Sequence, residues 1–389
     1  MVAESGSVLV GGALNNFFKG FRSEATRYSY LKKLREFLSF SGLSADEVIA
    51  IALSDPKRLE GLIGEYVGYL KCRNVSGSTI RQGVQAVKHL LVMNDSETSI
   101  SWYKLSKLMP PARKVGLDRA PTKEEIRRLL EYADIRMRAL ILLLVSSGIR
   151  IGSVEHLKWK HVEEVVTNGQ RFAKLRVPVA KGGDGYITFI SPEAYSALLE
   201  YRKLRESEGE KISGESPLIR VVKWSKTEAK GEPLPATSKS LRNELHILWH
   251  RAGLRNKSDG GAHDVKAVHG FRKFFATRLE NAGVGRLVVE TLLGHRVSLA
   301  SNYYKPTEKE LMEAYIKAIP EITISEAAEA RSEMQKRLIE SGVKIAELEK
   351  INTALQEKLT QLETEFNTLK TLVNELIAKS RRKKSKRNC

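Results

Sequence analysis

The side chains with the clearest chemical potential are two arginines and two histidines, which occur in a definite order. Arg150 follows the sequence Ser-Ser-Gly-Ile, His269 and Arg272 form an HxxR motif, and His295 follows Leu-Leu-Gly. Cleavage of a phosphodiester needs a nucleophile, stabilisation of charge on the phosphorane, and an acid for the leaving oxygen. Arginine suits the second task, because its planar guanidinium stays charged and binds two non-bridging oxygens. The four residues together predict phosphodiester chemistry rather than the surface ion pairs or structural histidines that each would suggest alone.

A pair of tyrosines supplies the candidate nucleophile. Tyr303 and Tyr304 lie eight and nine residues after His295. A tyrosine hydroxyl has an ordinary pKa of about 10, so it needs a base or nearby positive charge to attack phosphorus. The resulting phosphotyrosine would conserve bond energy and could be reversed without ATP. Lys181 lies in the sequence Lys-Gly-Gly-Asp-Gly and is either the general acid for the leaving 5′ oxygen or an ordinary turn lysine.

Metal chemistry is disfavoured by the same sequence. It contains no HExxH motif and no paired cysteines, and no acidic cluster lies near either histidine apart from Asp264. We therefore expect a site that uses no metal and no other cofactor.

The composition indicates a polyanionic partner. The chain has 389 residues, a formal net charge of +19 and 42% hydrophobic residues, which suits two or three domains with real cores. Nucleic acid is the favoured partner and a membrane surface is the alternative. Two cysteines, Cys72 and Cys389, give no disulfide framework, so we expect an intracellular setting. The longest apolar run, 139–145, is too short to span a bilayer.

The first part of the chain is predicted to be a helical domain. Residues 1–16 contain glycine and serine without a clear pattern and are expected to form a flexible arm. From 17 to 109, apolar residues recur at helical spacing, most clearly in three segments, 24–40, 57–71 and 78–93. Pro110-Pro111 then breaks the pattern, so residues 110–119 are expected to form an interdomain linker.

A second, mixed domain is expected over residues 120–325. Thr122 and Glu125 form a capping box at its start, and a buried helix runs from about 137 to 145, before Ser-Ser-Gly. Two β-rich segments, 171–179 and 186–190, predict a hairpin or small antiparallel sheet. Ser-Pro-Glu at 191–193 predicts a helix start with proline at its first position, and the remainder to about 318 is expected to be helical. The fold class is therefore mainly α with a small sheet.

The last part of the chain carries a heptad repeat. Leu348, Leu355, Leu362, Leu369 and Leu376 occupy the d position, and Ile345, Asn352, Leu359, Phe366 and Val373 occupy the a position. A parallel partner would pair Lys344 with Glu349, Lys358 with Glu363, and Glu365 with Lys370, all attractively. Residues 326–378 are thus predicted to form a parallel dimeric coiled coil, the alternative being one amphipathic helix folded back on its own domain. Residues 379–389 form a basic tail.

The motifs together resemble those of the tyrosine recombinase, or phage-type integrase, family. The family pattern is an arginine in a Gly-Leu-Arg turn, a lysine in a β-hairpin, His-x-x-Arg, Leu-Gly-His, and a tyrosine about nine residues later. It falls here on six residues: Arg150, Lys181, His269, Arg272, His295 and Tyr304. The resemblance covers residues 118–318, extends loosely over the N-terminal helices, and is greatest to archaeal integrases in the stretch that begins Tyr-Tyr-Lys-Pro.

This resemblance implies a role for each motif residue. Tyr304 would attack DNA to give a 3′-phosphotyrosine and a free 5′ hydroxyl, with Tyr303 as the alternative nucleophile. The two arginines would stabilise the phosphorane, His269 would exchange a proton with the nucleophile, His295 would hydrogen-bond the phosphate, and Lys181 would protonate the leaving group. The family acts without metal or ATP, usually as a tetramer on two DNA sites.

The sequence departs from the family pattern near Arg150. Many members carry an acidic residue three positions later, where this chain has Ser153, with Glu155 two residues beyond it. Two other functions share parts of the pattern: a type IB topoisomerase that relaxes DNA of any sequence, and a DNA-binding protein with a decayed site. The heptad repeat favours assembly and hence recombination.

Overall fold

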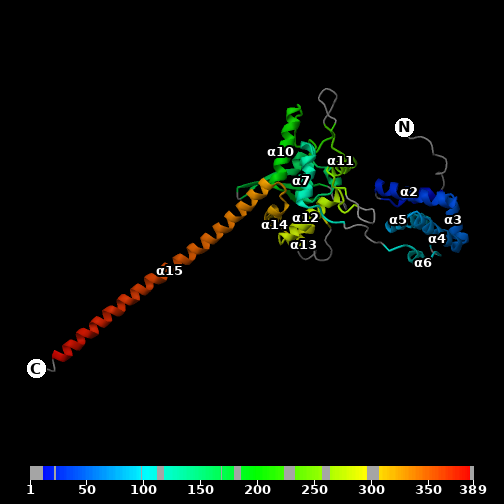
Figure 1. Cartoon of the computed structure of the whole chain (residues 1–389). Coiled ribbons are helices and arrows are strands. Elements are labelled where there is room, and N and C mark those ends of the chain that lie inside the picture. Colours follow the sequence, from blue (N-terminus) through cyan, green and yellow to red (C-terminus); the bar gives the residue numbers. More distant parts are fainter. Residues whose placement is uncertain are drawn as a thin grey trace. The chain divides into compact units, whose positions relative to one another are not determined.

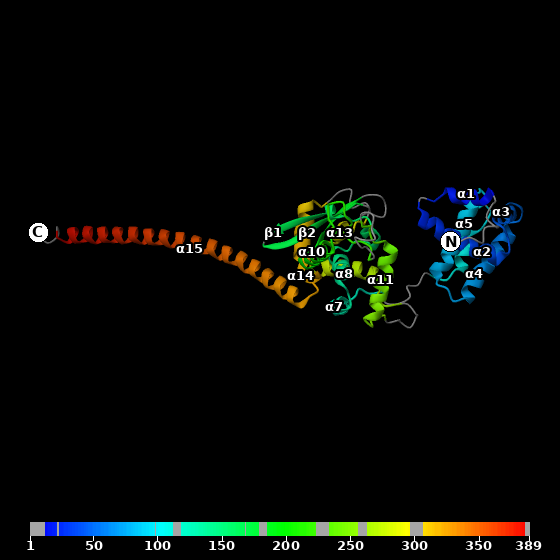
Figure 2. The ribbon, with the colours of Figure 1, turned by 90° about the horizontal axis from the view of Figure 1, so that it is seen from above.

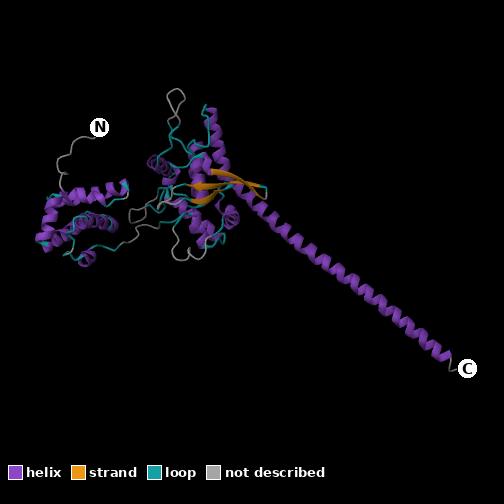
Figure 3. Ribbon diagram, turned by 180° about the vertical axis from the view of Figure 1, so that it is seen from behind, coloured by secondary structure: helices purple, strands orange, loops and turns teal. Residues whose placement is uncertain are grey.

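The computed structural model describes residues 12–21, 23–97, 99–111, 118–167, 169–178, 185–222, 233–255, 263–295 and 306–385. The chain divides into two compact units, Met1–Val115 and Gly116–Cys389. Each has its own hydrophobic core. Most of the described chain is helical, and the strands are confined to the second unit (Figure 3).

The described part of the first unit is helical. Its elements are α1 (Gly12–Lys19), α2 (Glu24–Ser41), α3 (Ala45–Ser54), α4 (Pro56–Cys72), α5 (Gly77–Val92) and α6 (Trp102–Leu108). Figure 1 labels α2 to α6. The periodic segments predicted at 24–40, 57–71 and 78–93 correspond to α2, α4 and α5. Their apolar faces form a common core that includes Leu34, Ile63, Tyr66 and Val87, all essentially inaccessible to solvent.

The predicted flexible arm, residues 1–16, extends too far. A helix begins at Gly12, and its residues Ala13, Leu14 and Phe17 are buried in the core of the first unit. The backbone N–H of Ala13 also donates to the Asp46 carboxylate at 3.0 Å. Two asparagines and the adjoining glycines obscured this short amphipathic pattern in the sequence.

The second unit contains a three-stranded antiparallel sheet in the order β1-β2-β3. The strands are β1 (Val162–Thr167), β2 (Gln170–Val177) and β3 (Tyr186–Ile190), and Figure 2 shows β1 and β2 side by side. The two segments predicted to be β-rich correspond to β2 and β3. The first strand was missed, because its exposed Glu163 and Glu164 and its edge position give it little apolar pattern.

Helices make up most of the rest of the described second unit. They are α7 (Lys123–Glu131), α8 (Ile135–Ser147), the short α9 (Ile151–Val154), the 3-10 turn η1 (Trp159–His161), α10 (Pro192–Ser207), α11 (Ser238–Arg251), α12 (His269–Asn281), α13 (Arg286–Leu292) and α14 (Glu308–Ile322). The capping box of Thr122 and Glu125 and the cap of α10 by Ser191 are present as predicted. The expectation of helix through to 318 was wrong between α10 and α11, where the described residues form turns and isolated bridges.

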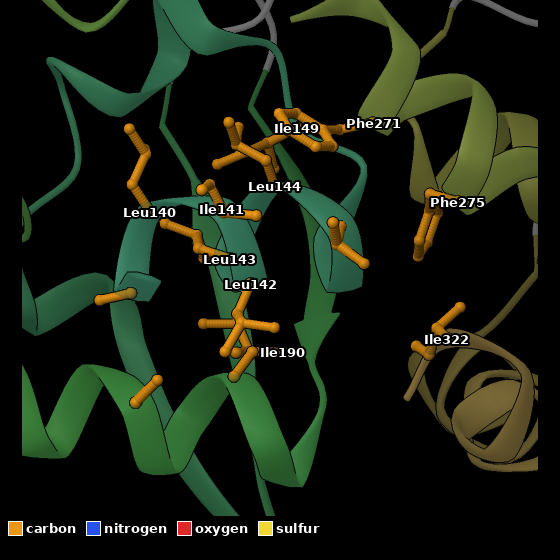
Figure 4. Packing of buried hydrophobic residues seen from close by; sticks show 14 of the residues in the cluster. Leu140, Ile141, Leu142, Leu143, Leu144, Ile149, Ile190, Phe271, Phe275 and Ile322 are labelled. Atoms are coloured by element: carbon orange, nitrogen blue, oxygen red, sulfur yellow. The ribbon is translucent and has the colours of Figure 1, made fainter. Parts of the chain in front are cut away.

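Helix α8 forms the centre of the second core. Eleven of its residues are buried, from Arg136 to Ser147. Figure 4 shows its side chains at 140–144 packed among Phe271 and Phe275 of α12, Ile190 of β3 and Ile322 of α14. A helix that is apolar on nearly every face must be enclosed on all sides. Its two ends are therefore fixed, and its C-terminal end leads directly to Arg150.

The last helix, α15 (Glu326–Ser385), is continuous over 60 residues (Figure 1). The backbone N–H groups of Ile324 and Ser325, just before it, donate to the Glu193 carboxylate at 2.8 Å each. The Arg127 side chain donates to the Ile324 carbonyl at 2.6 Å. The start of α15 is thus anchored to α7 and α10. Among the described residues, no single helix is both long and apolar enough to cross a membrane.

Candidate active site

The Arg272 guanidinium lies at the centre of the candidate site and is almost wholly buried, with 6% of the residue exposed. It donates to the carbonyl oxygens of Gly148 and Leu293, each at 2.6 Å. These carbonyls lie at the C-terminal ends of α8 and α13, where backbone oxygens lack helical partners and the helix dipole favours a cation. Arg272 therefore joins two helix ends, and α12 carries it to that position.

Two glycines make these helix ends possible. Gly148 and Gly294 have positive φ angles of 61° and 63°, the left-handed conformation that ends many helices. A Cβ on Gly148 would lie 2.4 Å from the Phe275 ring, and one on Gly294 would lie 2.4 Å from the Tyr186 ring. Both positions therefore require glycine for space as well as for conformation.

The end of α13 sets the position of His295. The N–H of Gly294 donates to the Thr291 carbonyl at 2.9 Å, and the N–H of His295 donates to the Glu290 carbonyl at 3.0 Å. This pair of bonds is the Schellman arrangement of a helix C-terminus. The His295 ring, exposed on one side, contacts the Glu290 carboxylate through Nδ1 and Arg272 through Nε2, the latter at 2.7 Å. Because arginine only donates, these contacts place the proton of neutral His295 on Nδ1.

Arg150 follows the same helix end as Gly148. It is the N-cap residue of α9, and its carbonyl accepts from the Ser153 N–H at 2.8 Å. Its side chain is partly exposed and makes no hydrogen bond with another described residue. Burial lowers the Arg272 pKa, and the nearby positive charge of Arg150 lowers it further. Two guanidinium groups that repel each other in this way favour an anion between them.

Comparison with known proteins points to one family. A model of the phage integrase family matches residues 120–310. Tyrosine recombinase XerC of Rickettsia rickettsii (strain Sheila Smith) is 24% identical over 308 residues, which cover 77% of this chain and 92% of the relative. XerC of Rickettsia bellii (strain RML369-C) is 23% identical over the same coverage.

The matched part of this chain, residues 120–310, belongs to the phage integrase family of tyrosine recombinases. The fold of the chain is also that of the Tn1549 transposon integrase, residues 82–397, solved in complex with circular intermediate DNA. The identity is 17%, the TM-score is 0.50, and the match covers 77% of this chain and 97% of that one. The XerA recombinase structure, 22% identical, matches 78% of this chain with a TM-score of 0.35.

In this tyrosine recombinase, Ser153 stands where many family members have an acidic residue, and the structure shows what the nearby Glu155 does instead. The Glu155 carboxylate accepts from the backbone N–H of Ser238 at 2.8 Å, in the first turn of α11. It also lies 3.5 Å from the His156 ring. Glu155 is therefore engaged in holding α11 and is not seen to pair with Arg150.

His269 is the first residue of α12, one turn before Arg272, and its side chain is exposed. Desolvation lowers its pKa most, and Lys273, Lys266 and Arg272 lower it further, while Asp118 opposes them. The Asp118 carboxylate pairs with Lys273 at 2.6 Å and with Lys266 at 3.2 Å. His269 is thus favoured in its neutral form, which is the form that accepts a proton.

Three of the predicted site residues, Lys181, Tyr303 and Tyr304, lie outside the described residues. The chain on either side of the tyrosines is anchored. His295 is held as above, and Glu308, at the start of α14, pairs with Lys174 of β2 at 2.8 Å. In α14, the Tyr315 hydroxyl donates to the Ser146 carbonyl at 2.8 Å, close to the end of α8.

Two residues near Arg272 were not predicted from the sequence. The only sequence signal for Glu290 is that it is an acidic residue about one helical turn before Leu-Gly-His. Tyr186, at the start of β3, packs on Gly294 and has no sequence signal beyond its nearness to Lys181. The described residues contain no group of three or more His, Cys, Asp or Glu side chains placed to hold a metal ion.

Proposed function

We propose that the chain is a site-specific recombinase that cuts and rejoins duplex DNA through a 3′-phosphotyrosine intermediate, without metal or ATP. The observation that carries the proposal is the convergence of Arg150, Arg272 and His295 at the joined ends of α8 and α13, in a chain of this family. A buried guanidinium held by two carbonyls and a histidine, beside a freer one, provides fixed positive charge where a phosphorane would form.

The remaining roles follow from the order of residues in the family. Tyr304 attacks the phosphorus, and its proton passes to neutral His269. Arg150 and Arg272 bind the non-bridging oxygens, and Lys181 donates a proton to the departing 5′ oxygen. His295 bonds the phosphate, while its contact with Glu290 keeps the ring oriented.

Trapping of the covalent intermediate tests this function. A nicked suicide substrate loses its short 5′-hydroxyl strand after cleavage and so retains the protein. Suicide substrates made from the DNA that flanks the gene, incubated in EDTA, should give a protein–DNA adduct that resists denaturation. Peptide mapping of the adduct should locate the phosphate on Tyr304.

Adjacent tyrosines provide a matched pair of variants. Tyr304→Phe should abolish the adduct, and Tyr303→Phe should retain it. If only Tyr303→Phe abolishes it, the nucleophile is the neighbouring residue. If both variants form the wild-type amount of adduct, neither tyrosine is the nucleophile and the assigned mechanism is wrong.

Two alternatives are separated by simple assays. A type IB topoisomerase would relax supercoiled plasmids of any sequence, whereas a recombinase should act only on plasmids that carry its site. A decayed, non-catalytic protein would bind DNA and give no adduct with any flanking sequence. The heptad repeat favours assembly on DNA and therefore the first function.

We propose a second copy of this chain as the partner of α15. Seven apolar residues at a and d positions between 345 and 369 are 55–66% exposed in the single chain. Leucine and phenylalanine at such spacing are normally enclosed by a partner helix. The attractive pairs at positions e and g, and the single polar Asn352 at an a position, favour a parallel dimer. Removal of residues 326–389 should reduce the oligomeric mass in light scattering, and an unchanged mass would contradict this partner.

DNA contacts outside the site are proposed from charge and family. The helical domain, from residue 12 to 109, and the catalytic domain, which begins at Asp118 because Asp118 and Arg119 are bonded to it, would contact the duplex, with the basic tail 379–389 adding phosphate contacts. Such contacts make affinity fall with salt, and deletion of the tail should reduce that salt dependence. The protein would act where the DNA is, in the cytoplasm of its cell.

A further inference from the structure

Tyr186, a residue to which the family pattern gives no role, lies against the proposed phosphate site. It is the first residue of β3, and its ring packs on Gly294, so closely that a Cβ on the glycine would lie 2.4 Å from the ring atoms. Gly294 directly precedes His295. The tyrosine ring therefore has a fixed place beside the helix end on which Arg272 and His295 meet.

The hydroxyl of Tyr186 is buried and makes no regular hydrogen bond with another described residue. Burial raises its pKa, and the charges of Arg272 and Arg150 only partly offset this effect. The group thus keeps its proton near neutral pH. The Arg272 guanidinium is close enough to influence it, although their geometry falls short of a regular hydrogen bond.

This environment has a chemical consequence. Guanidinium groups can only donate, so Arg272 and Arg150 can direct hydrogen atoms at the tyrosine oxygen but cannot accept its O–H. A buried donor without an acceptor costs free energy. No described residue supplies an acceptor to this hydroxyl. An acceptor that sits among the same two arginines would satisfy it, and an anionic oxygen is the group that they would hold there.

We propose that Tyr186 is a further catalytic residue, whose hydroxyl donates a hydrogen bond to a non-bridging oxygen of the scissile phosphate. The inference rests on the proposed function. Tyr186 keeps its proton throughout and forms no covalent bond, so it differs in role from the nucleophile. It adds a neutral donor to the two cations and completes the set around the phosphorane.

Tyr186→Phe tests the donor while it retains the ring that packs on Gly294. Because a hydrogen bond to a charged group is strong, its loss should make the variant form the adduct about 10- to 100-fold more slowly than wild type on a suicide substrate. Tyr195→Phe is the matched control. Its hydroxyl donates to Glu164 at 2.8 Å on β1, so the control removes a bonded tyrosine hydroxyl elsewhere in the same unit and should leave the rate unchanged.

Chiral methylphosphonate substrates distinguish a direct contact from a structural effect. Each stereoisomer replaces one non-bridging oxygen of the scissile phosphate by a methyl group. On the isomer that lacks the oxygen bound by Tyr186, wild type and Tyr186→Phe should react at equal rates. On the other isomer, the 10- to 100-fold difference should persist.

Two results would overturn the inference. An unchanged rate on ordinary DNA would show that the hydroxyl contributes nothing, and an equal loss on ordinary DNA and both isomers would show that it acts only on the shape of the site. Failure of the wild-type protein to form any adduct would instead contradict the proposed function, so the two failures are distinct.

Discussion

Arg272 and the apolar face of α15 differ in how far a single chain supplies their contacts. Arg272 is buried, and its guanidinium bonds two carbonyls and contacts a histidine, all from the same unit. Along α15, by contrast, Leu355 and Leu362 are 60% and 59% exposed. The first region is organised within a protomer, whereas the second has the composition of half an interface. Catalytic geometry and assembly should therefore respond to different substitutions.

Disruption of the apolar face of α15 should have the largest effect, and it should fall on assembly alone. The double variant Leu355→Asp, Leu362→Asp removes four core leucines from a dimer. At ~1.5–3 kcal/mol for each buried leucine, self-association should weaken by more than about 10³-fold. Sedimentation or light scattering across a concentration series measures this change.

Thr364→Asp is its control, because Thr364 lies at an outward f position of the same helix. The control should remain a dimer. Thermal unfolding of the catalytic unit should be the same in all three proteins. A loss of catalytic-unit stability in the double variant would mean that α15 packs on its own domain, and the two regions would then not be separable.

Substitution of Arg272 should have the next largest effect, and it should fall on catalysis. Lysine cannot reproduce the planar fork that bonds Gly148 and Leu293 together. Loss of one fixed donor at a site of developing charge lowers rates by about 10²–10³-fold. Adduct formation by Arg272→Lys should fall by that amount, with ~1–3 kcal/mol lost in stability from the unpaired carbonyls.

Arg278→Lys provides the comparison on the same helix. Arg278 pairs with Glu321 at 3.3 Å and lies over the Phe274 ring, away from the joined helix ends. Its adduct rate should stay within about twofold of wild type, since partly exposed pairs contribute little. Equal losses in the two variants would mean that α12 tolerates no lysine, and that Arg272 has no special role.

Substitution of two glycines should have a smaller effect. It should distinguish the need for a left-handed backbone from the need for space beside a neighbouring side chain. Gly283 and Gly294 both end helices with positive φ, 76° and 63°, but only Gly294 lies against another side chain. Alanine at Gly283 should cost ~1–2 kcal/mol of stability, measured by denaturant unfolding, with no change in adduct rate. Alanine at Gly294 should also displace the Tyr186 ring and reduce the rate about 10-fold. Similar rates in the two variants would show that the close approach has no catalytic consequence.

The sequence predicted local features well, because each depends on neighbours along the chain. The capping box of Thr122 and Glu125 and the end of the buried helix at Ser-Ser-Gly are of this kind. The meeting of Tyr186 with Gly294 is not, since it depends on how β3 packs against α13. Glu155 shows the converse, because a nearby acidic residue that could have supported Arg150 instead caps α11. Spacing therefore predicted the motif residues, and only the fold revealed their supporting contacts.

The smallest effect concerns the charges around His269, and its direction is diagnostic. The His269 pKa is lowered by partial desolvation and by Lys273, Lys266 and Arg272, and Asp118 opposes this shift. Removal of the negative charge in Asp118→Asn should lower the pKa further. Removal of a positive charge in Lys266→Met should raise it.

These shifts should appear in the pH dependence of cleavage. If neutral His269 accepts the proton of the attacking tyrosine, the rate falls on the acid side as the ring becomes protonated. That acid limb should move to lower pH in Asp118→Asn and to higher pH in Lys266→Met, with rates at the plateau changed only a few-fold. Single-turnover adduct formation from pH 5 to pH 8 measures it, with exposed Glu131→Gln as the control.

Opposite displacements would be hard to explain by damage to the fold, because both variants break the same ion pair. A loss of Asp118 contacts alone would move the two curves in the same direction. Displacement in one direction, or none, would therefore mean that His269 does not transfer the proton. The catalytic centre would then consist of the residues joined by Arg272, without His269 at the start of α12. The contrast between this self-contained centre and the exposed face of α15 would be greater still.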